Sequence, residues 1–383
     1  MRVLLVLPFP LLSEGGAAAK CAIGTARGLS ARGVEYRILS ADGRPRREPA
    51  PPQDLPIEVV PVAMPGGARA RWEHIARPHT LFCRPPFSER LRTLSREADI
   101  VHLVGLGAGS ATSLLDRPAL TQLDCSTLRD DRTWNPLRRE GRISIELLRA
   151  ERRVCRRSHW LLASSREVAR SLAASAPDAQ VVAAPLALDP VYYPERAPLE
   201  RPLVGLLGTA SWPPTSRAVE RLITRVWPLV THARPGTRLL LAGRGMERST
   251  FSHLPDLPGV EWRGAVPSAT EFLRELGVLL YPLTAGSGVK VKVLEALALG
   301  IPVVTTPAGG EGLGSREGVV VEADDARLAA SVVALCEDRE ARRAAGAAGY
   351  QTFIRHHSPL PATGPVVELY QRIVEAGLQR TAG

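Results

Sequence analysis

Residues 284–313 read TAGSGVKVKVLEALALGIPVVTTPAGGEGL. The glycine turn at residues 286–288 opens an apolar run that predicts a short helix. Gly300 ends this helix, and Pro302 prevents it from continuing. The β-branched residues 303–306 predict a strand, and the glycines after them predict a second flexible loop.

The chemistry of this stretch favours an anion. The first N–H groups of a helix have no partner inside the helix and carry a partial positive charge, so a phosphate binds there readily. Gly286 and Gly288 allow close approach to the backbone, and Lys290 and Lys292 add positive charge near the expected helix start. Glu295 follows one turn later, and a carboxylate can accept hydrogen bonds from both hydroxyls of a ribose. The stretch therefore predicts a nucleotide or nucleotide-sugar site.

The use of lysine supports this interpretation. Among the 49 lysines and arginines of the chain, the lysines are Lys20, Lys290 and Lys292. Lysine provides a compact charge where arginine provides a planar fork. Positive charge at a helix N-terminus weakens the helix, so a bound anion explains the two lysines better than helix stability does. The alternative is a solvated amphipathic helix start.

The run GSGVKVKVLEALALGIPVVTTPAGGEGL resembles the donor motif of family 4 glycosyltransferases, and within them a bacterial sugar-transferase subgroup whose motif closes on G-x-E-G-L. The resemblance covers nearly the whole chain. It implies an α/β protein of the GT-B architecture, with two Rossmann-like domains facing a central cleft. It also implies a retaining glycosyltransferase that uses a nucleoside-diphosphate-sugar as co-substrate, with no cofactor and no metal ion.

The resemblance assigns donor binding to residues in both domains. These residues are Gly15, Gly16, Thr209, Arg244, Gly286, Ser287, Gly288, Lys290, Lys292, Leu294, Glu295 and Glu311. Most members of the family carry two glutamates, eight positions apart, in the central motif. Here Ser287 stands at the first of these positions. Its backbone, Gly288 or Glu311 is expected to replace the missing contact with the sugar.

The catalytic candidates are Asp124, Lys290 and Glu295. Residues 99–104 predict a strand that resembles the D-x-V-H element of the family and contains His102. Asp124 follows a second predicted strand, at residues 119–123. Ligands of α/β proteins bind at the carboxyl ends of strands, so His102 and Asp124 are candidates for contacting the transferred sugar or the acceptor hydroxyl. A structural role is the alternative for His102.

The length of 383 residues predicts two domains. We place an acceptor-binding domain at 1–194 and a nucleotide-sugar-binding domain at 195–383, with the last helix, about 361–379, packing back on the first domain. The hydrophobic content of 45% suffices for two cores, and no apolar run is long enough to cross a bilayer. The five cysteines are scattered, which argues against a disulfide framework or a zinc site.

Two segments of the first domain are candidates for further recognition. Residues 41–98 are rich in proline and arginine, and the resemblance implies that such segments shape the acceptor pocket; a surface insertion is the alternative. Residues 143–157 predict a basic amphipathic helix that can contact an anionic membrane, with a solvated face as the alternative. The net charge of +10 suits an acidic acceptor or such a membrane, and we expect no nucleic-acid partner.

The N-terminus resembles a secretory signal, but Pro8 and Pro10 interrupt its apolar core, and cleavage would damage the glycine loop that follows. We therefore expect a cytoplasmic protein, peripheral on the inner face of the membrane if the basic helix binds lipid. The resemblance suggests a role in cell-surface polysaccharide, glycolipid or natural-product glycoside biosynthesis.

Three alternatives to a transferase remain. A GT-B nucleotide-sugar epimerase would convert the donor without an acceptor. A catalytically weak nucleotide-binding partner of an envelope-polymer assembly would bind nucleotide and turn nothing over, and the missing first glutamate is its only support. A nicotinamide-dependent oxidoreductase is least favoured, because no G-x-G-x-x-G motif with its acidic ribose partner is present.

Overall fold

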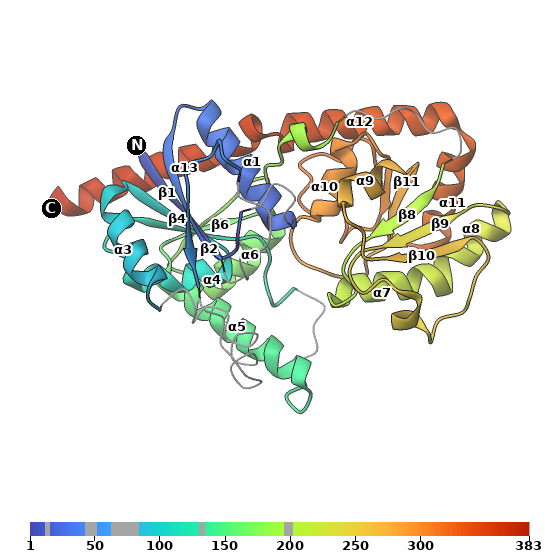
Figure 1. The fold of residues 1–383 in the computed structure, drawn as a ribbon, viewed down its shortest axis with the longest axis horizontal. Helices are drawn as coiled ribbons and strands as arrows, with labels where there is room; N and C mark the ends of the chain where they lie inside the picture. The colour runs from blue at the N-terminus through green and yellow to red at the C-terminus, as the bar shows by residue number, and fades with distance from the viewer. Residues whose placement is uncertain (12–15, 43–51, 63–83, 130–134, 195–201, 383) are drawn as a thin grey trace. The chain divides into compact units, whose positions relative to one another are not determined.

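The computed structural model describes residues 1–11, 16–42, 52–62, 84–129, 135–194 and 202–382. The chain divides into two compact units (Figure 1). Unit 1 comprises Met1–Asp189 together with Pro359–Gly383, and unit 2 comprises Pro190–Ser358. The chain therefore returns to unit 1 for its last helix. Residues 195–201, at the predicted boundary between the domains, lie outside the described residues.

Unit 1 is built on a parallel sheet of seven strands in the order β3-β2-β1-β4-β5-β6-β7. The strands are β1 (Arg2–Leu7), β2 (Glu35–Asp42), β3 (Ile57–Pro61), β4 (Ile100–Val104), β5 (Ala119–Leu123), β6 (Trp160–Ala163) and β7 (Gln180–Ala183). In the register, Leu4 of β1 lies opposite Arg37 of β2 and Val101 of β4. The central strands β1 and β4 are nearly continuous apolar runs, as is typical of parallel strands covered on both faces.

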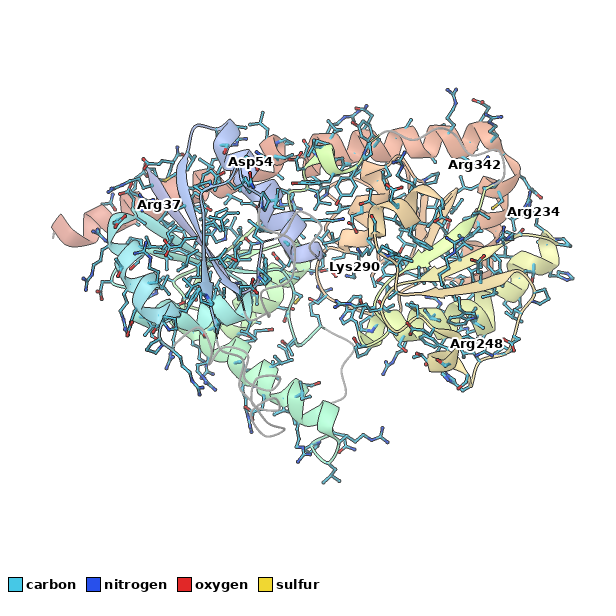
Figure 2. All side chains as sticks on the ribbon, in the orientation of Figure 1. Arg37, Asp54, Arg234, Arg248, Lys290 and Arg342 are labelled. Atoms are coloured by element: carbon cyan, nitrogen blue, oxygen red, sulfur yellow. The ribbon has the colours of Figure 1, made fainter. Side chains whose placement is uncertain are left out.

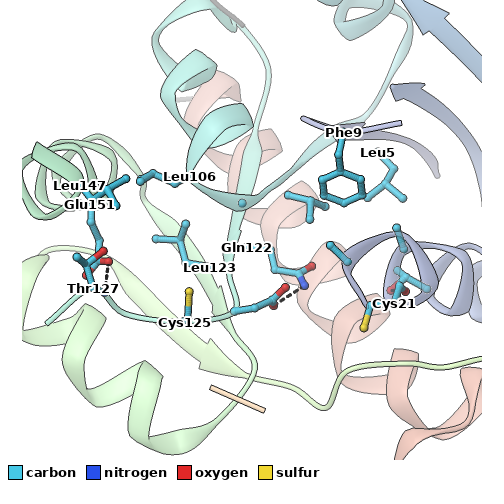
Figure 3. Close-up of a pocket in the computed structure, with 16 residues that line it drawn as sticks. Leu5, Phe9, Cys21, Leu106, Gln122, Leu123, Cys125, Thr127, Leu147 and Glu151 are labelled. Carbon is cyan, nitrogen blue, oxygen red and sulfur yellow. Dashed lines mark hydrogen bonds between the residues drawn. The ribbon is translucent and has the colours of Figure 1, made fainter. Parts of the chain in front are cut away.

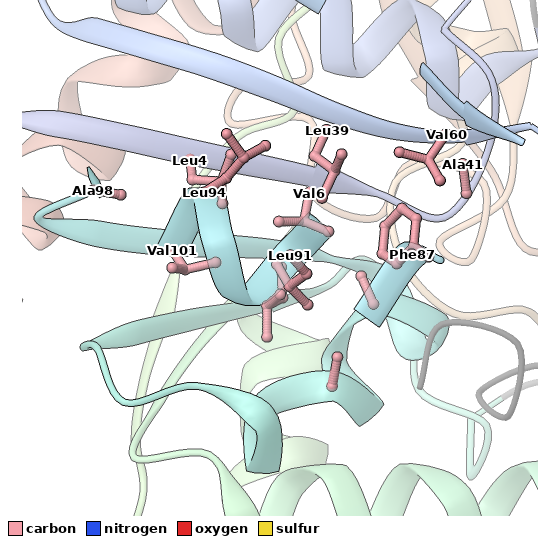
Figure 4. Packing of buried hydrophobic residues seen from close by; sticks show 13 residues of the cluster. Leu4, Val6, Leu39, Ala41, Val60, Phe87, Leu91, Leu94, Ala98 and Val101 are labelled. Carbon is pink, nitrogen blue, oxygen red and sulfur yellow. The ribbon is translucent and has the colours of Figure 1, made fainter. Parts of the chain in front are cut away.

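Helices connect and cover these strands. They are α1 (Ala17–Ala31), α3 (Phe87–Glu97), α4 (Gly105–Gly109), α5 (Arg139–Arg157), α6 (Arg166–Ser175) and α13 (Pro359–Ala382), with a 3-10 helix at Ser110–Leu114. Figure 4 shows the core beneath α3, where Phe87 and Leu91 pack against Leu4, Val6 and Val101 of the sheet. The apolar spacing of α3 therefore buries one side of the helix and leaves Arg92 and Arg96 exposed.

The last helix, α13, packs along α1 (Figure 1). Glycine makes this close approach possible, because a Cβ at Gly28 would overlap the Pro359 carbonyl and the Thr363 side chain. At the end of α1, the Arg32 guanidinium donates hydrogen bonds to the Leu360 carbonyl at 2.7 Å and to Thr363 Oγ1 at 3.3 Å. The C-terminal helix is thus an integral part of unit 1.

A buried polar contact also joins α13 to the sheet. His102 of β4 is fully buried, and its Nδ1 shares a hydrogen bond of 2.6 Å with the Tyr370 hydroxyl of α13. The two rings meet edge to face, with centroids 5.7 Å apart. Burial lowers the pKa of His102 to about 4, so the imidazole is neutral at physiological pH.

Unit 2 is built on a parallel sheet of six strands in the order β10-β9-β8-β11-β12-β13. The strands are β8 (Val204–Leu207), β9 (Leu239–Ala242), β10 (Val260–Gly264), β11 (Val278–Tyr281), β12 (Val303–Thr305) and β13 (Val319–Val321). The helices are α7 (Pro213–Arg221), a π-helical turn (Leu222–Val226), α8 (Trp227–Ala233), α9 (Ala269–Arg274), α10 (Val291–Ala298), α11 (Asp325–Glu337) and α12 (Arg339–His357), with 3-10 helices at Pro190–Tyr192 and Arg248–Phe251. Both sheets follow the Rossmann-like order, which confirms the predicted α/β class.

Some helices of unit 2 differ in their bounds from the sequence-based expectation. The helix of the central motif begins only at Val291, because Gly288 has a φ of 76° and Lys290, with a ψ of 97°, is still extended. The sequence also predicts a helix at residues 216–230. In the structure this helix begins earlier, at Pro213, where proline suits the first helical position. It then passes through the π-helical turn before α8. In contrast, the helix that the sequence predicts at residues 325–337 has the same bounds in the structure, as α11.

We predict that His102 makes the protein less stable in mild acid. Below pH 6.5 the unfolded chain binds a proton at this residue, whereas the folded protein binds it only near pH 4. The free energy of unfolding therefore falls as the pH drops through this window, by about 2 kcal/mol between pH 7 and pH 5. Urea unfolding of the His102→Gln variant should show a fall in the free energy of unfolding between pH 7 and pH 5 that is smaller than that of the wild type by this amount. Equal falls in both proteins would contradict the prediction.

Candidate functional site

The strand order of the unit 2 sheet reverses between β8 and β11, which lie side by side at its centre. In open parallel sheets, ligands bind beyond the carboxyl ends of the strands at such a point. Because all the strands are parallel, the loops after β8, β9, β11 and β12 leave the sheet at one edge. The predicted donor-binding residues of unit 2 lie in these loops and in α10.

The loop after β11 holds the glycine turn. Gly286 has a φ of 129° and Gly288 a φ of 76°, and residues with a side chain rarely adopt either conformation. A Cβ at Gly286 would lie 3.4 Å from the Trp212 ring, which belongs to the loop after β8. The loops after β8 and β11 are therefore in contact, and Trp212 is a neighbour of the turn that sequence reasoning did not single out.

Lys290 is the N-cap residue of α10, and only 4% of it is exposed. Its ammonium group donates a hydrogen bond to the Gly288 carbonyl, and Figure 2 shows the side chain at the start of α10. Lys292 follows in the first turn of the helix. The positive charge of Lys290 thus lies at the glycine turn, close to the unpaired N–H groups of the helix end. Both features favour an anion at this position.

The loop after β12 closes on the glycine turn through Glu311. Glu311 is 6% exposed, and its Oε1 accepts a hydrogen bond of 3.1 Å from the Gly288 backbone N–H. Thr306 anchors this loop, because its hydroxyl donates to the Leu283 carbonyl at 2.6 Å. The turn therefore already presents a backbone N–H to a carboxylate oxygen, a contact that resembles one to a phosphate oxygen.

Glu295 is fully buried in α10, and its carboxylate accepts hydrogen bonds from the side chains of Lys292 and Tyr193. Its Oε2 accepts a hydrogen bond of 2.7 Å from Lys292 Nζ, and its Oε1 accepts one of 3.3 Å from the Tyr193 hydroxyl. Tyr193 is itself buried and packs edge-on against Phe353 of α12, with ring centroids 6.4 Å apart. The helical spacing brings Lys292 and Glu295 together, whereas Tyr193 comes from a segment about a hundred residues away.

Thr209 and Arg244 lie in the loops after β8 and β9, which pack backbone against backbone. The Ala210 N–H donates a hydrogen bond of 2.9 Å to the Arg244 carbonyl. Gly243 lies so close to Gly208 that a Cβ there would overlap the Gly208 carbonyl. The Arg244 side chain is exposed at the edge of the sheet that also carries the glycine turn.

The two remaining donor candidates of unit 2 are mostly buried. Ser287 is 6% exposed within the turn. Leu294 is fully buried, and its N–H donates to the Lys290 carbonyl at 3.2 Å. Leu294 therefore packs α10 onto the unit and leaves the polar contacts of the site to its neighbours.

Unit 1 has a cavity of about 270 Å³ beside the carboxyl ends of β1 and β4, where the strand order of its sheet reverses (Figure 3). Side chains from β1, α1, α4, β5, α5 and their loops line it. They include Leu5, Phe9, Cys21, Leu106, Gln122, Leu123, Asp124, Cys125, Thr127, Leu147 and Glu151. Sequence reasoning identified only Asp124 among them, because the other residues have no polar motif that marks them.

Asp124 follows β5 and is half-buried in the cavity wall. Its Oδ1 accepts a hydrogen bond of 2.7 Å from Gln122 Nε2. Ser164 Oγ donates to its backbone carbonyl at 2.6 Å, which fixes the turn after the strand. Burial raises the pKa of Asp124 above that of an exposed carboxyl, although the Gln122 hydrogen bond acts in the opposite direction.

The other candidates of unit 1 lie apart from this wall. His102 is buried against Tyr370 and does not line the cavity. Gly16 is the exposed N-cap of α1, whose next turns line the cavity, and Gly15 lies outside the described residues. Within residues 41–98, the described parts form the end of β2, β3 and α3, and the remainder is outside the description.

No group of three or more histidine, cysteine, aspartate or glutamate side chains in the described parts is arranged to hold a metal ion. In the same parts, each helix is too short or too polar to cross a membrane.

Two family models match the chain, one in each half. Residues 16–187 match a model described as a glycosyl transferase 4-like domain. Residues 201–338 match a model described as glycosyl transferases group 1. No curated protein sequence is similar enough to the chain to count as a match.

Many solved structures share the fold at low sequence identity. Sucrose-phosphate synthase from Thermosynechococcus elongatus has a TM-score of 0.71 and 14% identity, over 98% of this chain and 100% of that one. HepE from Anabaena, in complex with UDP and glucose, has a TM-score of 0.65 and 15% identity, over 96% and 99%. An α,α-trehalose 6-phosphate synthase from Burkholderia multivorans has a TM-score of 0.66 and 14% identity, over 100% and 99%.

At these identities the structural likeness establishes the fold alone, which is the GT-B arrangement of two Rossmann-like domains. The family models add the chemistry, because both describe glycosyl transferases and together they cover most of the chain. The fold and the two matches together support the conclusion that this chain is a glycosyltransferase of the GT-B class.

Proposed function

We propose that the protein moves a sugar from a nucleoside diphosphate to a hydroxyl of an acceptor, with retention of configuration at the anomeric carbon. The observation that carries this proposal is the glycine turn of unit 2, with the Lys290 ammonium bonded to it and the start of α10 next to it. HepE, which shares the fold, is described in complex with UDP, so UDP is the first nucleotide to test.

In this proposal the glycine turn holds the diphosphate. Negative charge grows on the diphosphate as the bond to the sugar breaks. Lys290, the exposed Arg244 and the first N–H groups of α10 would stabilise this charge, because they are already oriented before the reaction begins. Thr209 would contribute from the adjacent loop. The proposal needs no metal ion and no cofactor, since side chains and backbone supply the positive charge.

Two glutamates are assigned to the donor's hydroxyl groups. Glu295 would accept hydrogen bonds from the ribose, with the hydrogen bond from Lys292 orienting its carboxylate. The hydrogen bond from Tyr193, at 3.3 Å, is the longer of the two and would give way first. Glu311 would replace the glutamate that the family carries at the position of Ser287, because its carboxylate reaches the backbone of the next residue, Gly288.

Unit 1 is assigned to the acceptor. Asp124 lines the cavity at the switch point of that sheet, so its carboxylate would accept a hydrogen bond from the acceptor hydroxyl. We place this activity in the cytoplasm, in the assembly of a cell-surface glycan, a glycolipid or a natural-product glycoside. An epimerase remains the second candidate, because it would use the same donor site and need no acceptor.

We predict that Lys290→Ala weakens nucleotide binding at least tenfold. The variant removes a buried charge that would form a charge-assisted hydrogen bond to phosphate, worth about 1.5–3 kcal/mol. Thermal unfolding should be followed with UDP, GDP, dTDP and ADP in the absence of metal. One nucleotide at ~100 times its dissociation constant should stabilise the wild type by about 2.7 kcal/mol.

Arg343→Ala is the matched control, because it removes one positive charge from an exposed position on α12. It should bind the nucleotide as the wild type does. Equal binding by Lys290→Ala and the wild type would remove the glycine turn from the donor site.

We predict that Glu295→Ala lowers turnover of the sugar nucleotide at least tenfold, measured as release of the free nucleoside diphosphate. The loss reflects a charged acceptor that the ribose would otherwise use. Tyr193→Phe deletes only the longer hydrogen bond to Glu295 and should reduce turnover less. A wild-type rate in Glu295→Ala would refute the assignment. Conversion of the donor sugar without nucleotide release would favour the epimerase.

We also propose a peripheral contact between α5 and an anionic membrane. The helix carries exposed arginines along much of its length, at positions 142, 149, 152, 153, 156 and 157. Leu137, just before the helix, is 89% exposed, which suits insertion at a lipid surface. Basic residues near such a surface contribute about 1 kcal/mol each.

Vesicle sedimentation tests this contact. The wild type should bind phosphatidylglycerol vesicles and not phosphatidylcholine vesicles. Replacing Arg152, Arg153 and Arg156 by alanine should lower the affinity about a hundredfold, since three contacts are lost. Replacing the exposed Arg339, Arg343 and Arg355 of α12 changes the net charge equally and should have little effect. A similar loss of vesicle affinity in both variants would mean that binding depends on net charge in general and not on α5.

A further inference from the structure

We infer that the cavity of unit 1 takes an apolar alcohol or phenol as the acceptor, and excludes sugars. That the ligand serves as an acceptor rests on the proposed function. Which ligand binds follows from the cavity itself.

The wall is mainly apolar, and its apolar side chains come from opposite sides of the cavity. In Figure 3, Leu5 and Phe9 lie on one side, and Leu106, Leu123 and Leu147 lie on the other. They come from β1, the loop after it, α4, α5 and β5. Such a surface gains free energy by removing an apolar ligand from water, and it offers a sugar hydroxyl no partner.

Most polar groups of the wall are already paired within the protein. Glu151 accepts hydrogen bonds from Ser126 Oγ at 2.9 Å and from the Thr127 N–H at 2.6 Å, so both carboxylate oxygens are occupied. The Thr25 hydroxyl donates to the Cys21 carbonyl of its own helix at 3.0 Å. These groups shape the wall, and a ligand would have to break their hydrogen bonds to use them.

Asp124 is the exception. Gln122 occupies its Oδ1, and no side chain in the described parts of the chain bonds to its Oδ2. One carboxylate oxygen is therefore available for one hydroxyl of a ligand. Burial raises the pKa of this carboxyl, as expected for a group beside an apolar cavity. The cavity thus combines an apolar body with a small polar region at Asp124, where one hydroxyl of a ligand can bind.

The number of polar partners in the cavity distinguishes a sugar from an apolar alcohol as the acceptor. A monosaccharide would place several hydroxyls against apolar side chains, and each buried hydroxyl without a partner lowers affinity by roughly tenfold or more. An apolar alcohol has one hydroxyl, and Asp124 satisfies it. The volume of 270 Å³ equals that of about nine water molecules in the liquid, which suits a small ring system or a short chain.

Binding to the purified full-length protein tests the inference without any donor. The probes are 2-naphthol, 2-methylnaphthalene and methyl α-glucoside, measured by calorimetry or by the fluorescence of the naphthalene ring. We expect 2-naphthol to bind, 2-methylnaphthalene to bind at least tenfold more weakly because it has no hydroxyl, and methyl α-glucoside not to bind. Tighter binding of the glucoside than of 2-naphthol would overturn the inference.

Two variants locate the binding. Leu147→Glu places a charge in the apolar wall and should weaken 2-naphthol binding at least tenfold. Leu148→Glu makes the same change at the next residue of α5, which is similarly half-buried but does not line the cavity, and should bind like the wild type. Asp124→Ala should bind 2-naphthol and 2-methylnaphthalene equally. Equal binding by both leucine variants, with unchanged melting temperatures, would place the ligand elsewhere and refute the inference.

Nucleotide binding, measured on the same samples, separates this inference from the proposed function. If UDP or another nucleotide binds and the donor is turned over, but 2-naphthol does not bind, the acceptor class is wrong and the transferase proposal stands. If 2-naphthol binding depends on Leu147 but no nucleotide binds, the cavity chemistry is correct and the transferase proposal fails.

Discussion

Burial of each parallel sheet on both faces is the constraint on which the rest of this structure depends. Strands such as β1 and β11 are almost wholly apolar, so they have no polar side chains to offer a ligand. The chemistry of the chain is therefore concentrated in loops at the carboxyl ends of the strands. In both units these loops gather at the point where the strand order reverses.

The loops of unit 2 hold one another in place through polar contacts. The Gly288 N–H bonds to Glu311, the Lys290 ammonium bonds to the Gly288 carbonyl, and Lys292 pairs with Glu295. Charges that are oriented before a ligand arrives need little reorganisation when negative charge develops, which is why such an arrangement suits the departure of a diphosphate. The same contacts explain how buried charged groups are tolerated in this unit.

The cavity of unit 1 follows a different principle. Its charged group Glu151 is occupied by the protein's own Ser126 and Thr127, so its wall is apolar in effect although it contains acidic residues. Selectivity then comes from the few polar atoms that the wall leaves available, among them one oxygen of Asp124. A site of this kind discriminates by the cost of burying hydroxyls rather than by many specific contacts.

The sequence alone determined the class of the fold, and it located the residues that we propose for the donor site. Apolar runs located the strands and helices, and glycines located the turns between them, because these are local properties of the chain. The spacing of Lys292 and Glu295 placed the two side chains on one side of α10. The tertiary structure alone brought Glu311 to Gly288, Tyr193 to Glu295 and Trp212 to Gly286. It also paired His102 with Tyr370, 268 residues later, and assembled the apolar cavity. The physical reason is that these contacts depend on strand order and on how helices pack over a sheet. Neither the periodicity nor the spacing of residues along the chain records that arrangement.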